Sequence, residues 1–198
     1  MSRTFYLPVY TSPQIANTNP SPNRMSIVTY SQLGRNGRLG NQMFQIAATI
    51  AYGIEHGKRA VFPKWEYSRF MKYPLNEGDC PYPVTHKEPA FTHSPIPTVE
   101  GNVDLHGYFQ SEKYFSNCKE HIQRVFRLSE DHAKIVNEWF LNRVQMSGVD
   151  GAKTCSIHVR RGDYESNSGT KAYHGLLGMD YYVEAIARLP QPADVVLF

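Results

Sequence analysis

The feature that most constrains the fold is a strand, a glycine-containing loop, a helix and a second strand that follow one another within residues 27–62. Ile27-Val28-Thr29-Tyr30 is a short run typical of a strand. Residues 41–56 carry apolar side chains at the helical period, namely Met43, Ile46, Ala47, Ile50, Ala51 and Ile54. Gly57 is placed to end this helix, and Arg59-Ala60-Val61-Phe62 begins the next strand. Such a β-loop-α-β unit predicts an α/β fold.

The loop of this unit holds glycines at positions 34, 37 and 40, with the spacing G-x-x-G-x-x-G. Dinucleotide-binding turns have G-x-G-x-x-G and phosphate-binding loops end in G-K-[ST], so the spacing disfavours a nicotinamide cofactor and ATP. The turn brings backbone amides and the side chains of Asn41 and Gln42 to a helix N-terminus, where negative charge is stabilised. Gly40, Asn41 and Gln42 are therefore candidate substrate-binding residues, with a turn that serves packing alone as the alternative.

Two adjacent arginines follow a second strand-like segment, residues 154–159, in which polar and apolar residues alternate. Arg160 and Arg161 should emerge at the C-terminal end of this strand, the edge at which open α/β sheets bind ligands. Paired guanidinium groups fit phosphate oxygens, so the pattern favours a diphosphate site, with a solvated basic turn as the alternative. The tripeptide Arg161-Gly162-Asp163 could indicate adhesion, but nothing else in the sequence suggests an extracellular protein.

Three segments carry a family resemblance: residues 37–45 (GRLGNQMFQ), 105–115 (LHGYFQSEKYF) and 158–164 (HVRRGDY). Together, and in this order, they resemble glycosyltransferase family 11, which contains the α-1,2-fucosyltransferases. The resemblance extends from about Met25 to the last residue. It implies an enzyme that moves L-fucose from GDP-fucose to the 2-hydroxyl of a galactose-type acceptor. It also implies inversion at the anomeric carbon and no requirement for a metal or other cofactor.

The chemistry implied by this resemblance assigns roles to the arginine turn. Transfer leaves negative charge on the departing diphosphate, which a fixed cation stabilises more in the transition state than in the ground state. Arg160 matches the essential arginine of the family motif and is the expected catalytic residue. His158 and Arg161 are candidates for binding the donor, and Asp163 for orienting Arg160; a structural role is the alternative for each of the three. The catalytic base is left open, because the leaving phosphate could also accept the proton.

The resemblance further implies a GT-B-like architecture of two Rossmann-like domains. Residues 1–24 are rich in Pro, Asn, Ser and Thr and are expected to be a disordered extension. Residues 25–150 are expected to form the first domain. Residues 151–198 would begin a donor-binding second domain, which we expect to be incomplete because the apolar run at 195–198 predicts a buried parallel strand. The chain is therefore interpreted as a fragment.

Before the expected domain boundary, Ser129 is placed to cap an amphipathic helix that runs to about Met146. Its apolar stripe is expected to lie in the core and consists of Ile135, Val136, Trp139, Phe140 and Val144. Residues 147–151 then form a flexible link. Farther upstream, residues 64–100 hold many prolines and aromatic residues, which either help to bind the acceptor sugar or pin the loop to the core.

Composition excludes several other classes of protein. The net charge of +3 is small and the basic residues are dispersed, so no nucleic-acid partner is expected. Cys80, Cys118 and Cys155 lack C-x-x-C spacing, which favours a reducing compartment. Cys80, His86 and His93 have no fourth partner, so no metal site is expected. The sequence has no signal peptide and no apolar run of about 20 residues. It predicts a cytoplasmic protein of bacterial or viral type, with peripheral membrane association left open.

Two other functions fit parts of the pattern. An α-1,6- or protein O-fucosyltransferase would share the arginine motif, although such enzymes usually lack the strings at 37–45 and 105–115. A non-catalytic module that binds glycans or nucleotides would also be consistent with a chain that ends at Phe198.

Overall fold

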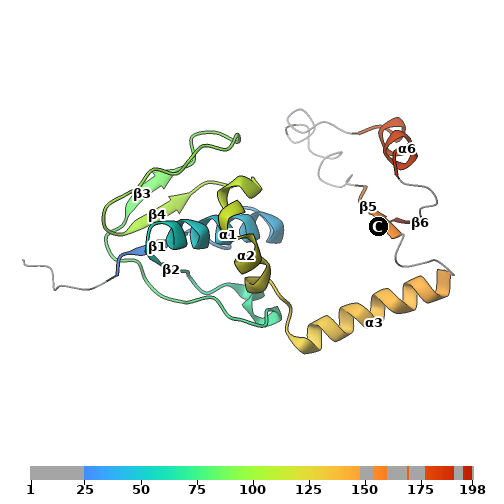
Figure 1. Ribbon diagram of the computed structural model, residues 1–198, viewed down its shortest axis with the longest axis horizontal. Coiled ribbons are helices and arrows are strands. Elements are labelled where there is room, and N and C mark those ends of the chain that lie inside the picture. The colour runs from blue at the N-terminus through green and yellow to red at the C-terminus, as the bar shows by residue number, and fades with distance from the viewer. Residues whose placement is uncertain (1–24, 148–153, 160–168, 170–176, 190–193, 198) are drawn as a thin grey trace, which may run out of the picture. The chain divides into compact units, whose positions relative to one another are not determined.

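The structure is a computed structural model that describes residues 25–147, 154–159, 169, 177–189 and 194–197. By its internal contacts the chain divides into two compact units, Met1–Arg127 and Leu128–Phe198. Each unit is an arrangement of helices and parallel strands (Figure 1). The α/β class predicted from the sequence is therefore confirmed.

The first unit is built on a four-stranded sheet with the strand order β2-β1-β4-β3, in which every neighbouring pair is parallel. The strands are short: β1 is Ile27–Thr29, β2 is Arg59–Val61, β3 is Val84–Lys87 and β4 is Val103–His106. Because the strands run in the same direction, their carboxyl ends meet at one edge of the sheet. The two strands of the predicted β-loop-α-β unit are confirmed as β1 and β2.

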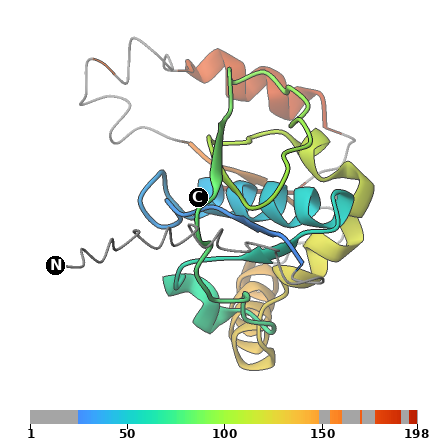
Figure 2. The same cartoon turned by 90° about the vertical axis from the view of Figure 1, so that its left-hand side faces the viewer.

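The helix between β1 and β2 is α1, Leu39–Glu55, and it begins two residues before the predicted start at Asn41. It packs against β1 and β2, and Figures 1 and 2 show it lying along the sheet. The inward face of α1 meets the sheet in one apolar cluster, whose buried members are Val28, Tyr30, Leu33, Ile46, Ala48, Tyr52, Phe62, Trp65, Val103, Leu105 and Phe109. The predicted helix is thus confirmed. Of its predicted inward face, Ile46, Ala47 and Ala51 are buried, but Ile54 is 52% exposed, which corrects that part of the prediction. Burial of the cluster is the main source of stability for the unit.

Short helices complete the first unit. They are η1 (Glu66–Phe70), η2 (Glu112–Tyr114), η3 (Ser116–Cys118) and α2 (Lys119–Val125). The hydroxyl of Ser111 accepts a hydrogen bond from the backbone amide of Lys113, as a cap of the η2 turn does. The interpretation that the aromatic loop is pinned to the core holds for Trp65, whereas Tyr73, Tyr82 and Phe91 are exposed. A role of the loop in binding the acceptor stays a prediction.

The second unit contains α3 (Glu130–Ser147), β5 (Thr154–Ile157), α6 (Met179–Ala187) and β6 (Asp194–Leu197). β5 and β6 pair in parallel, which confirms the parallel strand predicted at the end of the chain. The predicted burial of the α3 stripe is not observed, since its described members, Ile135, Val136, Trp139 and Phe140, are 40% to 61% exposed. An amphipathic pattern predicts that a face can be buried, but it does not supply the partner that buries it.

Some expectations fall on residues that the structure does not describe. These include the extension at residues 1–24 and the link at 148–151. The contact-based division lies between Arg127 and Leu128, so the sequence-based boundary near Gly151 stays a prediction. None of the helices within the described ranges combines the length and apolar character needed to cross a bilayer.

Candidate functional site

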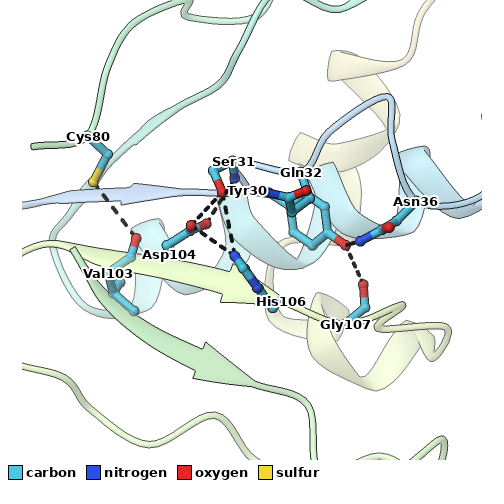
Figure 3. Close-up of polar contacts among 9 residues, drawn as sticks. All are labelled: Tyr30, Ser31, Gln32, Asn36, Cys80, Val103, Asp104, His106 and Gly107. Carbon is cyan, nitrogen blue, oxygen red and sulfur yellow. Dashed lines mark hydrogen bonds and ion pairs between the residues drawn. The ribbon is translucent and has the colours of Figure 1, made fainter. Parts of the chain in front are cut away.

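A group of polar side chains lies at the carboxyl edge of the first sheet, where β1 and β4 end side by side (Figure 3). The carboxylate of Asp104 accepts a hydrogen bond from the backbone amide of Ser31 at 2.9 Å and another from the Ser31 hydroxyl at 2.6 Å. Nε2 of His106 lies 3.0 Å from the same carboxylate. Ser31, just after β1, thus forms one hydrogen-bonded cluster with Asp104 and His106 of β4, more than 70 positions away in the sequence.

The alternation of β4 explains why Asp104 and His106 share a face. Val103 and Leu105 belong to the apolar core with α1, so the residues between and after them point to the opposite face. The Asp104 side chain is 8% exposed and that of His106 is 29% exposed. The cluster therefore has a buried acidic end and a histidine end that solvent and ligands can reach.

This geometry differs from that of a nucleophilic serine site. In a Ser-His-Asp triad the serine and the carboxylate bind different nitrogens of the imidazole. Here the Ser31 hydroxyl donates to Asp104, and the nitrogen of His106 nearest to it, at 3.5 Å, is the same Nε2 that contacts the carboxylate. A carboxylate only accepts, so Nε2 carries the proton and Nδ1 of the neutral ring is the free acceptor. The cluster can receive a proton from a ligand but is not arranged to activate Ser31.

The glycine loop of the first motif is held by side chains of α1. Gly37 adopts φ +77°, and a Cβ there would lie 2.2 Å from Nδ2 of Asn41. Gly34 also has a positive φ, of +84°, but it has open space around it. Only Gly37 therefore needs glycine for both its conformation and its close packing.

Of the predicted binding residues in this loop, Gly40 is exposed and Asn41 is half-buried, whereas Gln42 is buried. The Gln42 side chain donates to the carbonyl of Gly37 at 3.0 Å and accepts from the indole N–H of Trp65 at 2.8 Å. Both ends of its amide are thus used within the protein. The structure places Gln42 under the loop, where it holds the loop to the core, and leaves Gly40 and Asn41 nearer the surface.

The second motif continues from β4 into a turn whose backbone amides are bound by the carboxylate of Glu88, which is half-buried. Gly107 has φ +159° and Phe109 has φ +49°. Glu88, which follows β3, accepts hydrogen bonds from the backbone amides of Tyr108 and Phe109 at 2.7 and 2.9 Å and from the Tyr114 hydroxyl at 3.1 Å. Glu88 accepts the hydrogen bonds of these amides and so stabilises the positive-φ backbone conformation of Phe109.

The structure brings the first two motifs together. Nε2 of Gln45, from the first motif, donates to the carbonyl of Gly107 at 3.4 Å, and the Tyr30 hydroxyl donates to the same carbonyl at 2.7 Å. Asn41 and Gln110 are also hydrogen-bonded through their side chains. Two strings separated by about sixty residues in the sequence are therefore joined in one framework, and the second string also supplies His106 of the polar cluster.

The third motif is described only at its start. His158 is exposed and directly follows β5, which ends at Ile157, two residues before the predicted end of the strand at Val159. It borders a hollow of about 250 Å³ between β5 and α6. Arg160, Arg161 and Asp163 lie outside the described residues, so their predicted roles are untested.

Possible metal ligands and the three cysteines relate to the expectations of no metal site and of reduced thiols. No cluster of His, Cys, Asp or Glu within the described ranges could hold a metal ion. All three cysteines are free thiols. Burial raises the pKa of Cys80, and the nearby Asp104 charge adds to this effect, which makes the thiol a weak nucleophile near neutral pH.

Sequence reasoning missed four residues of this site: Ser31, Glu88, Asp104 and His106. A signal for two of them was present, because Asp104 and His106 alternate with Val103 and Leu105 and so share a face at a strand end. Nothing local pointed to the other two, which reach the site through pairing between strands.

The first unit is an α/β fold with a polar cluster at the carboxyl edge of a parallel sheet, the edge at which proteins of this class commonly bind ligands. The model of the family described as Glycosyl transferase family 11 matches residues 90–198, more than half of the chain. The chain belongs to this family, which confirms the resemblance; the match covers the second and third motifs, at 105–115 and 158–164.

Curated relatives carry related names. An Escherichia coli O-antigen biosynthesis glycosyltransferase, WbnK, is 33% identical over 44% of this chain and 28% of its own length. An Escherichia coli alpha-1,2-colitosyltransferase is 26% identical over 82% of the chain and 64% of its own. The rabbit (Oryctolagus cuniculus) galactoside alpha-(1,2)-fucosyltransferase 2 is 29% identical over 65% and 38%. The chain thus spans less than two thirds of the length of each of these relatives.

Among solved structures, the fucosyltransferase NodZ from Bradyrhizobium aligns with 89% of this chain and 71% of its own, at 12% sequence identity and a TM-score of 0.45.

Proposed function

We propose that this protein is a glycosyltransferase that moves L-fucose from GDP-fucose to the 2-hydroxyl of a galactose-type acceptor, with inversion and without a metal. The observation that carries the proposal is the presence of three family motifs in order, two of which meet beside a polar cluster at one sheet edge. Family membership supports glycosyl transfer. The relatives named for α-1,2 transfer support the linkage.

We assign the donor to the third motif. Arg160 would bind the departing diphosphate and stabilise its growing negative charge, with His158 and Arg161 contacting the donor and Asp163 orienting Arg160. The parallel β5-α6-β6 arrangement supports a Rossmann-like second domain, and hence a GT-B-like architecture.

We assign the acceptor to the carboxyl edge of the first sheet. Tyr108 lies two residues beyond His106 and stacks on Phe91, with ring centroids 5.8 Å apart and an angle of 12° between the planes. Both rings are partly exposed, and their position next to the polar cluster suits a sugar, which has apolar C–H faces and hydroxyl groups. Gly40 and Asn41 are proposed to border this site, whereas Gln42 supports it from below.

The reaction is tested by incubating the protein with GDP-fucose and lactose and treating the product with an α-1,2-specific fucosidase. We expect a fucosylated lactose that the α-1,2-specific fucosidase cleaves. GDP-colitose should be offered in parallel, because one relative is named for α-1,2 transfer of colitose. An α-1,6- or protein-linked product would show that another fucosyltransferase activity is present, and GDP or glycan binding without transfer would indicate a binding module.

The donor assignment is tested by calorimetric titration with GDP. Arg160→Ala should weaken GDP binding about 10- to 100-fold, the loss expected when one charge-assisted hydrogen bond to a phosphate is removed. Arg188→Ala is the matched control, because Arg188 forms an exposed ion pair with Glu184 on α6, and such pairs contribute little. Equal GDP affinity of the wild type and Arg160→Ala would refute the role of Arg160.

A further inference from the structure

We propose that His106 is the catalytic base that removes the proton from the acceptor hydroxyl, and that Asp104 and Ser31 are positioning residues that orient its ring. This inference rests on the proposed fucosyl transfer and adds the proton acceptor that such a transfer needs. It concerns the acceptor alone and follows from the cluster at the ends of β1 and β4 (Figure 3).

The imidazole of His106 is held in a defined direction. Asp104 fixes Nε2 at 3.0 Å, and because the carboxylate cannot donate, Nδ1 of the neutral ring has its lone pair free. No hydrogen bond of Nδ1 occurs within the part of the chain that the structure describes.

The carboxylate of Asp104 is itself held by hydrogen bonds. Its two oxygens already accept two hydrogen bonds from Ser31, and the Ser31 hydroxyl in turn accepts one from the Gln32 side chain at 3.5 Å. The carboxylate is thereby fixed before it contacts His106. When the imidazole takes up a proton, the buried negative charge of Asp104 stabilises the imidazolium that forms.

Residues of β1, β3 and β4 and of the segments that follow them surround the His106 ring. Lys87 on β3 is the register partner of His106, the Tyr30 ring centroid lies 6.4 Å from that of His106, and Glu88 donates its backbone amide to the His106 carbonyl. Within the described ranges, Asp104 is the residue in ionic contact with the imidazole.

The proton transfer balances as follows. The acceptor hydroxyl oxygen forms a bond to the anomeric carbon of fucose, and the bond from that carbon to the β-phosphate oxygen breaks. The electron pair of the broken bond stays with GDP, and the hydroxyl proton moves to Nδ1 of His106. The imidazolium, hydrogen-bonded through Nε2 to Asp104, then releases a proton to water.

The test compares His106→Gln, Asp104→Asn and Ser31→Ala with His121→Gln, a matched control on an exposed face of α2. His106→Gln should lower kcat at least 100-fold while leaving GDP affinity unchanged, and Asp104→Asn should lower kcat about 10- to 100-fold. Ser31→Ala, which keeps the backbone hydrogen bond, should have a smaller effect. Thermal unfolding of each variant verifies that it is folded.

The pH profile distinguishes a base from a positioning group. Wild-type kcat should fall as the pH decreases and His106 becomes protonated, and His106→Gln should lose this acidic limb. In nitrogen-15 spectra of the wild-type chain, the His106 ring should carry its proton on Nε2, and methyl β-galactoside should shift the Nδ1 resonance.

The possible results separate this inference from the proposed function. If the wild type transfers fucose but a folded His106→Gln variant keeps its kcat within threefold and retains the acidic limb, the base is elsewhere and the proposed function stands. If the galactoside shifts His106 but the wild type transfers no fucose, both the transfer and the proton role are refuted. If transfer occurs and the galactoside leaves the His106 resonances unchanged, the acceptor binds elsewhere and the inference fails.

Discussion

Replacing Gln42 by Met would test whether this residue supports the glycine loop or binds substrate directly. The change removes two hydrogen bonds, to the Gly37 carbonyl and from the Trp65 indole, but keeps nearly the same side-chain volume. The buried Trp65 N–H loses its partner, which costs about 1–3 kcal/mol, and loss of the bond to the more exposed Gly37 costs about 1 kcal/mol. Burial of the methionine returns up to about 1 kcal/mol. We expect a net destabilisation of about 2–3 kcal/mol.

The assay is urea unfolding followed by tryptophan fluorescence in a Trp139→Phe background. The chain has two tryptophans, so Trp65 then reports on the first unit alone. With an m-value of about 2 kcal/mol/M, the expected loss lowers the urea midpoint by about 1–1.5 M. Gln110→Met is the control, because Gln110 is exposed and its hydrogen bond to Asn41 is at the surface, so its effect should stay within about 0.5–1 kcal/mol.

The reasoning would be refuted by a Gln42→Met midpoint equal to that of the control and an unchanged Trp65 emission spectrum. If stability is unchanged but the KM for donor or acceptor rises, Gln42 contacts the substrate directly, as the sequence pattern alone suggests.

Two further predictions concern other described residues. Glu88→Ala should destabilise the first unit by about 2–4 kcal/mol, because two backbone amides and a tyrosine hydroxyl lose a charged acceptor, whereas the exposed Glu100→Ala should have little effect; equal urea midpoints would contradict this. Iodoacetamide should alkylate Cys80 more slowly than a free cysteine model compound at pH 8, with a rate that continues to rise with pH, because burial raises the pKa of Cys80 and the thiolate is the reactive form. Peptide mass spectrometry measures both rates, and labelling as fast as that of the model compound would show that the thiol is accessible and its pKa is not raised.

Local patterns predicted the elements of the first unit well and the role of its polar residues poorly. The α1 period identified a helix and its buried face, because that information lies within 17 consecutive residues. The role of Gln42 was harder to infer, since a polar side chain near a helix N-terminus fits ligand binding as well as structure. Gln42 lies on the same face as Gln45, Ile46 and Thr49, at spacings of three, four and seven, and this face is buried.

The cluster of Ser31, Asp104 and His106 could not be derived from local pattern for a different reason. It requires β1 to pair with β4, although β2 and β3 lie between them in the sequence, and a register that sets Thr29 beside Asp104. Period-two alternation shows that Asp104 and His106 share a face, but only the strand pairing brings Ser31 to them. Similarly, the apolar stripe of α3 indicates a face that can be buried, while burial itself depends on a partner.

At the sheet edge, some polar residues hold the backbone in place and others are able to exchange a proton with a ligand. This difference changes how the motifs should be interpreted. In the first two motifs, Gln42 and Gln45 hold the loop and join it to Gly107, and the amides that follow Gly107 are occupied by Glu88. Several polar groups of these strings are thus engaged within the protein. The groups able to exchange a proton with a ligand belong to Asp104, which directly precedes the second string, and to His106, the second residue of that string. Substitutions within the framework should therefore act mainly on stability, whereas substitutions at His106 should act on kcat.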